Sequence, residues 1–121
     1  MLYIAFDTCY AHPLPERHRF PMIKYELLPK QLLLEGTCTP EQFFSPKPIA
    51  KNTVLRVHDH EYYEQLCALT LSKAEVRGLG FPISKALVHR EHVIAQGTID
   101  GAEHALKYGI AMNIAGGTHH A

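Results

Sequence analysis

The chain has 121 residues, which is enough for one compact domain and too few for two. Its 12 basic and 12 acidic residues give a formal net charge of zero, so no overall field attracts it to nucleic acid or to an anionic membrane. No apolar run approaches the roughly 20 residues of a membrane span, and we expect neither nucleic acid nor membrane as a direct partner.

The three cysteines point to a reducing compartment. Cys9, Cys38 and Cys67 are odd in number, widely spaced and outside any CxxC pattern. This arrangement favours reduced thiols over a disulfide framework or a zinc ribbon. The chain also begins without a basic region that leads into a long apolar core. We therefore expect a cytoplasmic protein.

The first third of the chain predicts a strand, a loop and a helix. Residues 2–6 are apolar and β-favouring, which predicts a buried strand. Residues 11–21 contain three prolines without apolar periodicity, and this predicts a loop of fixed shape. Helical spacing of apolar residues over 22–35 predicts a helix that Gly36 can end, with Pro29 as a kink or as the start of a second helix.

The middle of the chain predicts shorter elements. Residues 39–41 resemble a short helical start, and a surface connection through Pro48 is expected after them. Residues 54–57 predict an extended segment. Asp59 is placed to cap a helix that runs to about Leu69, after which glycine and proline interrupt the chain.

The last third predicts the longest helix and a second strand. Ser84 opens the helix and Gly109 can close it. Its expected apolar stripe consists of Leu87, Val88, Ile94, Ala95, Ile99, Ala102, Ala105 and Leu106. Residues 110–115 have almost no polar side chain, which is typical of a strand covered by helices on both faces of a parallel sheet. This element order predicts the α/β class.

The most informative candidates are two adjacent histidines after this strand. His119 and His120 follow Gly116 and Gly117, at the strand end where open α/β sheets bind ligands. In a turn, both imidazole rings can converge on one pocket. One ring could then take a proton from water while the other, charged, stabilises developing negative charge. The alternative is a polar strand end with two surface histidines.

The remaining histidines support weaker interpretations. Residues 58–60 read His-Asp-His, yet a zinc site needs three or four converging ligands, and Asp59 is already explained as a helix cap. His89 and His92 flank Arg90 and Glu91, which favours a solvated helix face.

The proline-rich loop holds three further polar candidates. His12, His18 and Arg19 could form a rim or stabilise an anion, or they could simply lie at the surface. The sequence contains no GxSxG elbow, no phosphate-binding loop and no HExxH motif, and no cysteine belongs to a recognised nucleophile pattern. Covalent nucleophilic catalysis is therefore unsupported.

Several segments together resemble one family. Residues 116–121 read GGTHHA and resemble the GGxHHA signature of the histone deacetylase superfamily, and residues 111–115 resemble the strand before it. Residues 18–22 resemble the HRxxM segment of that family, and residues 57–62 resemble its VHxxxY segment. The likeness spans almost the whole chain and is closest to bacterial and class IV-like members.

The resemblance implies a fold and an activity. It implies an arginase/deacetylase-like three-layer αβα fold with a mainly parallel sheet, and a zinc-dependent amidohydrolase that removes acetyl groups from lysine side chains or related amines. His120 would be the general base, and His119 its mainly electrostatic partner. Gly117 and Phe81 would line the acyl-lysine tunnel, and Arg19 would guard an internal channel.

The chain also departs from the family pattern. The family's Asp/His/Asp zinc ligands follow the GGxHHA motif at a distance, so no residue here is assigned to the metal and no zinc is expected to bind this chain specifically. The family's acidic rim residue falls near Gly80. We therefore expect residues 1–121 to be the N-terminal portion of a single deacetylase-like domain, incomplete and inactive alone.

Two further expectations follow. Unpaired strand edges of an incomplete sheet predict self-association into a homo-oligomer. The alternative to an enzyme portion is a non-catalytic interaction or assembly module with a deacetylase-like half-fold. A ureohydrolase relationship is more remote, because Thr118 and His120 do not fit the motif of that family.

Overall fold

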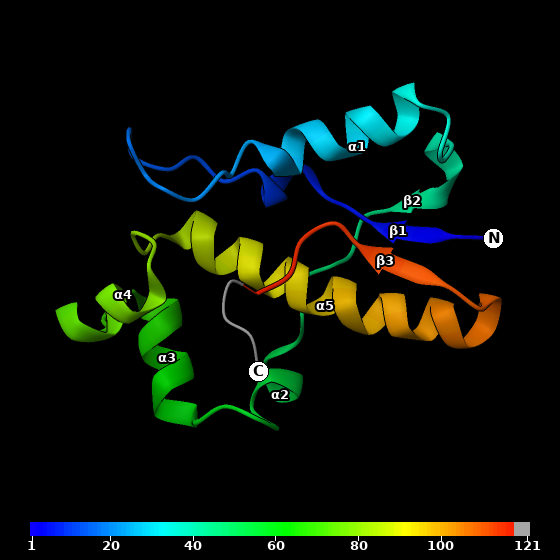
Figure 1. Cartoon of the computed structure of the whole chain (residues 1–121). Helices are drawn as coiled ribbons and strands as arrows, with labels where there is room; N and C mark the ends of the chain where they lie inside the picture. Colours follow the sequence, from blue (N-terminus) through cyan, green and yellow to red (C-terminus); the bar gives the residue numbers. More distant parts are fainter. Residues whose placement is uncertain (118–121) are drawn as a thin grey trace.

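A three-stranded parallel sheet organises the chain. The computed structural model describes residues 1–117. Within them, the strands β1 (Tyr3–Ala5), β2 (Phe43–Phe44) and β3 (Ala111–Asn113) lie in the order β2-β1-β3. Ile4 of the central strand pairs with Phe43 on one side and with Met112 on the other (Figure 1). The predicted α/β class is confirmed.

The chain also forms five α-helices and two 3-10 helices among the described residues. They are η1 (Thr8–Tyr10), α1 (Lys24–Leu34), η2 (Pro40–Gln42), α2 (Lys51–Val54), α3 (His60–Ala68), α4 (Lys73–Leu79) and α5 (Lys85–Tyr108), where η marks a 3-10 helix. The long α5 packs against β1 and β3. In the view of Figure 1, α1 lies above β1 and α5 below it, while α3 and α4 gather near the start of α5. This arrangement agrees with part of a deacetylase-like αβα fold.

The caps predicted from the sequence are confirmed. The carboxylate of Asp59 accepts hydrogen bonds from the backbone N–H groups of Glu61 and Tyr62, at the start of α3. The Ser84 hydroxyl accepts from the Leu87 N–H at the start of α5. Gly109 ends α5 with a φ of 95°, a conformation that glycine adopts without a Cβ clash.

Three short elements correct the sequence-based expectations. Residues 54–57 are not extended, because the Leu55 and His58 N–H groups close helical turns onto the carbonyls of residues 51 and 54. Phe43–Phe44 form a strand where a surface connection was expected. The sequence did not indicate this strand, because its pairing partner β1 lies about 40 residues earlier in the chain. Ser72 and Glu75 form a capping box that starts α4, which the sequence interpretation missed.

The buried face of α5 also differs from the predicted stripe. Its buried residues are Leu87, Val88, Arg90, Val93, Ile94, Gly97 and Gly101. Leu106 is 90% exposed, although it was expected to face the core. The helix turns Gly97 inward, because the absence of a side chain there allows Tyr10, Asn113 and Pro46 to approach its backbone closely. No helix of the described residues is long and apolar enough to cross a bilayer.

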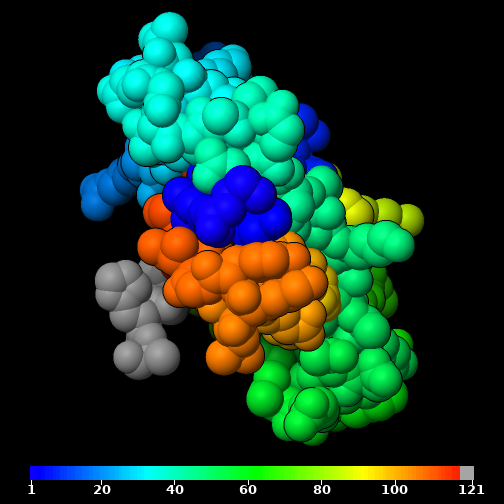
Figure 2. All heavy atoms as spheres, turned by 90° about the vertical axis from the view of Figure 1, so that its right-hand side faces the viewer, coloured from blue at the N-terminus to red at the C-terminus, as the bar shows by residue number. Residues whose placement is uncertain are grey.

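The start of the sheet reaches the surface. Figure 2, turned by 90° from Figure 1, shows the N-terminal segment in blue between the cyan-green region of α1 and β2 and the orange end of α5. The opposite ends of the strands point into the molecule, where Ile114 and Ala115 are buried. The carboxyl end of β3 therefore leads toward the interior and α5.

Candidate functional site

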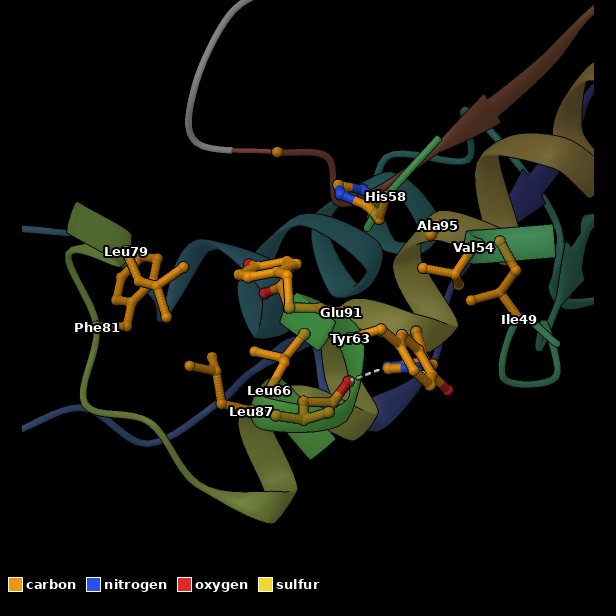
Figure 3. A pocket seen from close by; sticks show the side chains of 14 residues that line it. Ile49, Val54, His58, Tyr63, Leu66, Leu79, Phe81, Leu87, Glu91 and Ala95 are labelled. Atoms are coloured by element: carbon orange, nitrogen blue, oxygen red, sulfur yellow. Dashed lines mark hydrogen bonds between the residues drawn. The ribbon is translucent and has the colours of Figure 1, made fainter. Parts of the chain in front are cut away.

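A cavity of about 320 Å³ lies beside the segment that follows β3. Its walls are mainly apolar. Figure 3 shows Leu79 and Phe81 on one side of it and Ile49 and Val54 on the other. His58, Tyr62, Tyr63, Glu91 and His92 add polar atoms to the lining. An apolar cavity with a few polar groups is the usual form of a small-molecule site.

The structure brings two predicted tunnel residues to this cavity. Gly117 and Phe81 both line it, although they lie far apart in sequence. Gly117 is exposed, whereas Phe81 is buried and only 9% exposed. Phe81 follows Gly80, which ends α4 in the left-handed conformation with a φ of 77°. This turn directs the chain from α4 toward the cavity.

The other predicted site residues are either outside the cavity lining or outside residues 1–117. Arg19 is exposed in the loop before α1 and is outside the cavity lining. The predicted catalytic residues His119 and His120 lie outside the described residues 1–117. Gly117, the last described residue, lines the cavity.

Asn113 anchors the segment that leads to these histidines. Its Oδ1 accepts a hydrogen bond of 3.0 Å from the Tyr10 hydroxyl and one of 3.4 Å from the Ala115 N–H. Its Nδ2 donates to the Ile94 carbonyl at 2.9 Å and to the Thr98 Oγ1 at 3.1 Å. One side chain therefore ties the end of β3 to α5 and to η1.

Gly97 makes this anchor possible. A Cβ at Gly97 would lie 2.7 Å from the Tyr10 hydroxyl, 2.9 Å from Asn113 Nδ2 and 3.0 Å from Pro46 Cγ. The anchor therefore needs glycine at this point of α5. Burial raises the pKa of the Tyr10 hydroxyl, so the group stays protonated and can donate to Asn113.

A buried arginine supports the same region. Arg90 is only 2% exposed, and its Nε donates to the Tyr10 carbonyl at 2.8 Å. Its Nη1 lies 2.5 Å from Glu91 Oε1, and its guanidinium lies over the Tyr25 ring. The expected solvated face at 89–92 is wrong at this position, because a guanidinium that is hydrogen-bonded and stacked can be buried.

The two histidines near Arg90 on α5 differ in burial. His89 is exposed, as expected. His92 is half-buried, and its Nδ1 lies 2.7 Å from the Val88 carbonyl. Because a carbonyl only accepts, Nδ1 is the donor, and Nε2 accepts from the Tyr63 hydroxyl at 3.3 Å (Figure 3). This pair gives the cavity wall a fixed polar position.

The described residues do not fit a zinc site. Among residues 1–117, no group of three His, Cys, Asp or Glu side chains could hold a metal ion. In the His-Asp-His segment, the Asp59 carboxylate caps α3, and His60 Nε2 lies 3.8 Å from Glu64 Oε1. We therefore assign no reaction step to a metal within these residues.

Comparison with known proteins identifies the family. A parallel α/β sheet with a cavity at the carboxyl end of a strand defines the class of α/β proteins that bind ligands there. The histone deacetylase domain matches residues 15–121. An uncharacterized protein of Picosynechococcus sp. is 40% identical over 118 residues, which cover 98% of this chain and 39% of that protein. The chain belongs to the histone deacetylase family and spans about two fifths of the length of this relative.

Sequence reasoning missed the residues that position the site. Asn113 was visible as the polar residue in a strand that is otherwise apolar, and this was the available signal. Tyr10 and Arg90 gave no comparable signal, because tyrosine and arginine are common at surfaces and their contacts join distant parts of the chain.

Proposed function

We propose that this chain is the N-terminal part of a zinc-dependent deacetylase that hydrolyses the amide of acetyl-lysine or of a related acetylated amine. The main support is the cavity that Gly117 and Phe81 line, because Gly117 precedes the His119–His120 pair by two residues in the sequence. Family membership supplies the deacetylase class. The substrate, the metal dependence and the roles of individual residues are the proposed part.

The lining of the cavity suits an acylated amine better than a free one. Leu79, Phe81, Leu87 and Ile49 offer apolar contacts to a methylene chain. Acetylation removes the charge of a lysine side chain. The carboxylate in the lining, Glu91, is already paired with Arg90, so an ammonium would be costly to bury among the apolar side chains. The neutral acetylated substrate should therefore enter more readily than the charged product.

The histidine pair supplies proton transfer in this proposal. His120 takes a proton from the attacking water and returns it to the leaving amine, while His119 stabilises the negative charge that develops. Residues 1–117 do not fit a zinc site, so the metal would be held by another part of the complete enzyme. We propose that the chain alone is inactive for this reason.

A chimera tests the function. This chain would replace the matching segment of the Picosynechococcus protein, and hydrolysis of an acetyl-lysine reporter would be measured with added zinc. We expect turnover by the chimera, negligible turnover by the chain alone, and a loss of about 100-fold or more in the chimera with His120→Ala.

His89→Ala is the matched control, because His89 is an exposed histidine of the same chain. Robust turnover by the chain alone would contradict the proposed inactivity. A folded chimera that does not hydrolyse the reporter would contradict the deacetylase function and favour the non-catalytic assembly module.

A further inference from the structure

The ring of Phe81 packs against two rings of the proline-rich loop, residues 11–21. The His18 ring stacks on it with centroids 5.3 Å apart and planes inclined by 22°. Phe20 contacts it edge-on, also at 5.3 Å, with an angle of 89°. Phe81 is thus held by two rings of this loop while it lines the cavity. Stacked and edge-to-face pairs of this kind are favourable beyond their buried area.

Two hydrogen bonds fix the His18 ring. Its Nδ1 lies 3.1 Å from the backbone N–H of Phe20, and its Nε2 lies 3.0 Å from the carbonyl of Gly80. A backbone N–H only donates and a carbonyl only accepts. Both bonds therefore form together in one neutral tautomer, with Nδ1 as the acceptor and the hydrogen on Nε2.

The bond to Gly80 acts directly on the chain that carries Phe81. Gly80 is the left-handed cap of α4, and Phe81 is the next residue. His18 therefore binds both the backbone just before Phe81 and the Phe81 ring itself. The hydrogen bond of His18 to Gly80 connects the loop to this segment across 62 residues of sequence.

We propose that His18 is a positioning residue that holds Phe81 in the cavity wall and thereby sets the affinity for the acylated chain. This inference rests on the proposed function for its kinetic consequence. His18 acts through Phe81 and Gly80, so its loss should weaken substrate binding in the ground state and in the transition state alike. Such a loss raises KM and leaves kcat nearly unchanged.

Two amide substitutions separate the two bonds of His18. Glutamine can place an amide N–H near the position of Nε2 and keep the bond to Gly80. Asparagine is shorter and can place only an acceptor near the position of Nδ1, so it keeps the bond from the Phe20 N–H and loses the bond to Gly80. In the active chimera, we expect His18→Asn to raise KM about tenfold with kcat within about twofold, and His18→Gln to raise KM about threefold or less.

The control variant is His89→Asn, which changes an exposed histidine of α5 and should leave KM unchanged. A purely structural role would lower the folded fraction, and with it the apparent kcat, in both His18 variants. Equal KM values for His18→Asn and His18→Gln, or a fall in kcat with KM unchanged, would overturn the proposal.

Nuclear magnetic resonance of the 121-residue chain tests the inference without activity. Long-range proton–nitrogen correlations should identify His18 as the tautomer with hydrogen on Nε2, and His18→Asn should shift the Phe81 ring signals while His89→Asn does not. Hydrogen on Nδ1, or unshifted Phe81 signals, would contradict the positioning role. If the chimera is inactive while these signals behave as expected, the proposed deacetylase function is wrong and the positioning role of His18 is supported. If His18→Asn does not fold, the tautomer of His18 in the native chain and the Phe81 signals of His18→Gln still test the positioning role.

Discussion

Asn113 shows how much positioning one amide can supply. Its two donors and its acceptor oxygen are all used, by Ile94, Thr98, Tyr10 and Ala115. The Ile94 carbonyl can only accept and the Ala115 N–H can only donate, and these two backbone partners determine the orientation of the whole amide group. The backbone of Ala115 is thereby held two residues before Gly117, which lines the cavity.

Replacing this amide should destabilise the protein. In Asn113→Asp, the carboxylate cannot donate to the Ile94 carbonyl or to the Thr98 hydroxyl, so both hydrogen bonds from Nδ2 are lost. We expect a loss of about 2 kcal/mol in the free energy of unfolding, measured by urea denaturation at neutral pH. Asn52→Asp is the control, because Asn52 is exposed in α2 and should change stability little. Similar losses in both variants would refute the anchoring role.

At the scale of elements, the approach between α5 and η1 depends on one glycine. In Gly97→Ala, the new Cβ would lie within 3.0 Å of Tyr10 and Asn113 atoms. Overpacking of this kind typically costs about 1–3 kcal/mol, which exceeds the gain of about 1 kcal/mol in helix propensity. We expect a net loss of stability in thermal or urea unfolding.

Gly101 provides the comparison within the same helix. A Cβ at Gly101 has no heavy atom within 4 Å among the described residues. Gly101→Ala should therefore gain about 0.5–1 kcal/mol from reduced backbone freedom in the unfolded chain. Equal effects of the two substitutions would show that Gly97 does not limit the approach of α5.

The length of an element decides how well sequence predicts it here. α5 has 24 residues, an N-cap at Ser84 and a glycine stop, and several independent signals agree on its bounds. β2 has two residues and exists because β1 offers it a partner. An apolar run of two residues cannot be distinguished by sequence pattern from part of a loop. The cavity residues Gly117 and Phe81 came from a family resemblance, whereas the contacts of His18 and Asn113 required coordinates.

At the scale of the whole molecule, β3 has an unpaired edge. Within residues 1–117, it pairs with β1 on one side only. Ile110 and Met112 are 56% and 49% exposed beside this edge. Exposed apolar strand edges pair readily with other chains. We therefore expect the isolated chain to self-associate through β3.

Sedimentation velocity at increasing concentration checks this expectation. The native chain should shift toward larger species, and Met112→Lys should reduce the shift, because a charge on an edge strand disfavours pairing. Leu106→Lys is the control, since Leu106 is 90% exposed on α5 rather than on the strand. A native chain that remains monomeric at high concentration would contradict self-association.

The single long helix α5 fixes the rotation between two groups of its residues, those that line the cavity and those that face η1 and β3. α5 presents Leu87, Val88 and Glu91 to the cavity, and Gly97 and Gly101 are buried further along the same helix. Inserting one residue between these groups would rotate one against the other by about 100°. The cavity wall and the close approach to Tyr10 could then not both form. Homologous chains should therefore tolerate length changes in the loops around α5 and exclude them between residues 91 and 97.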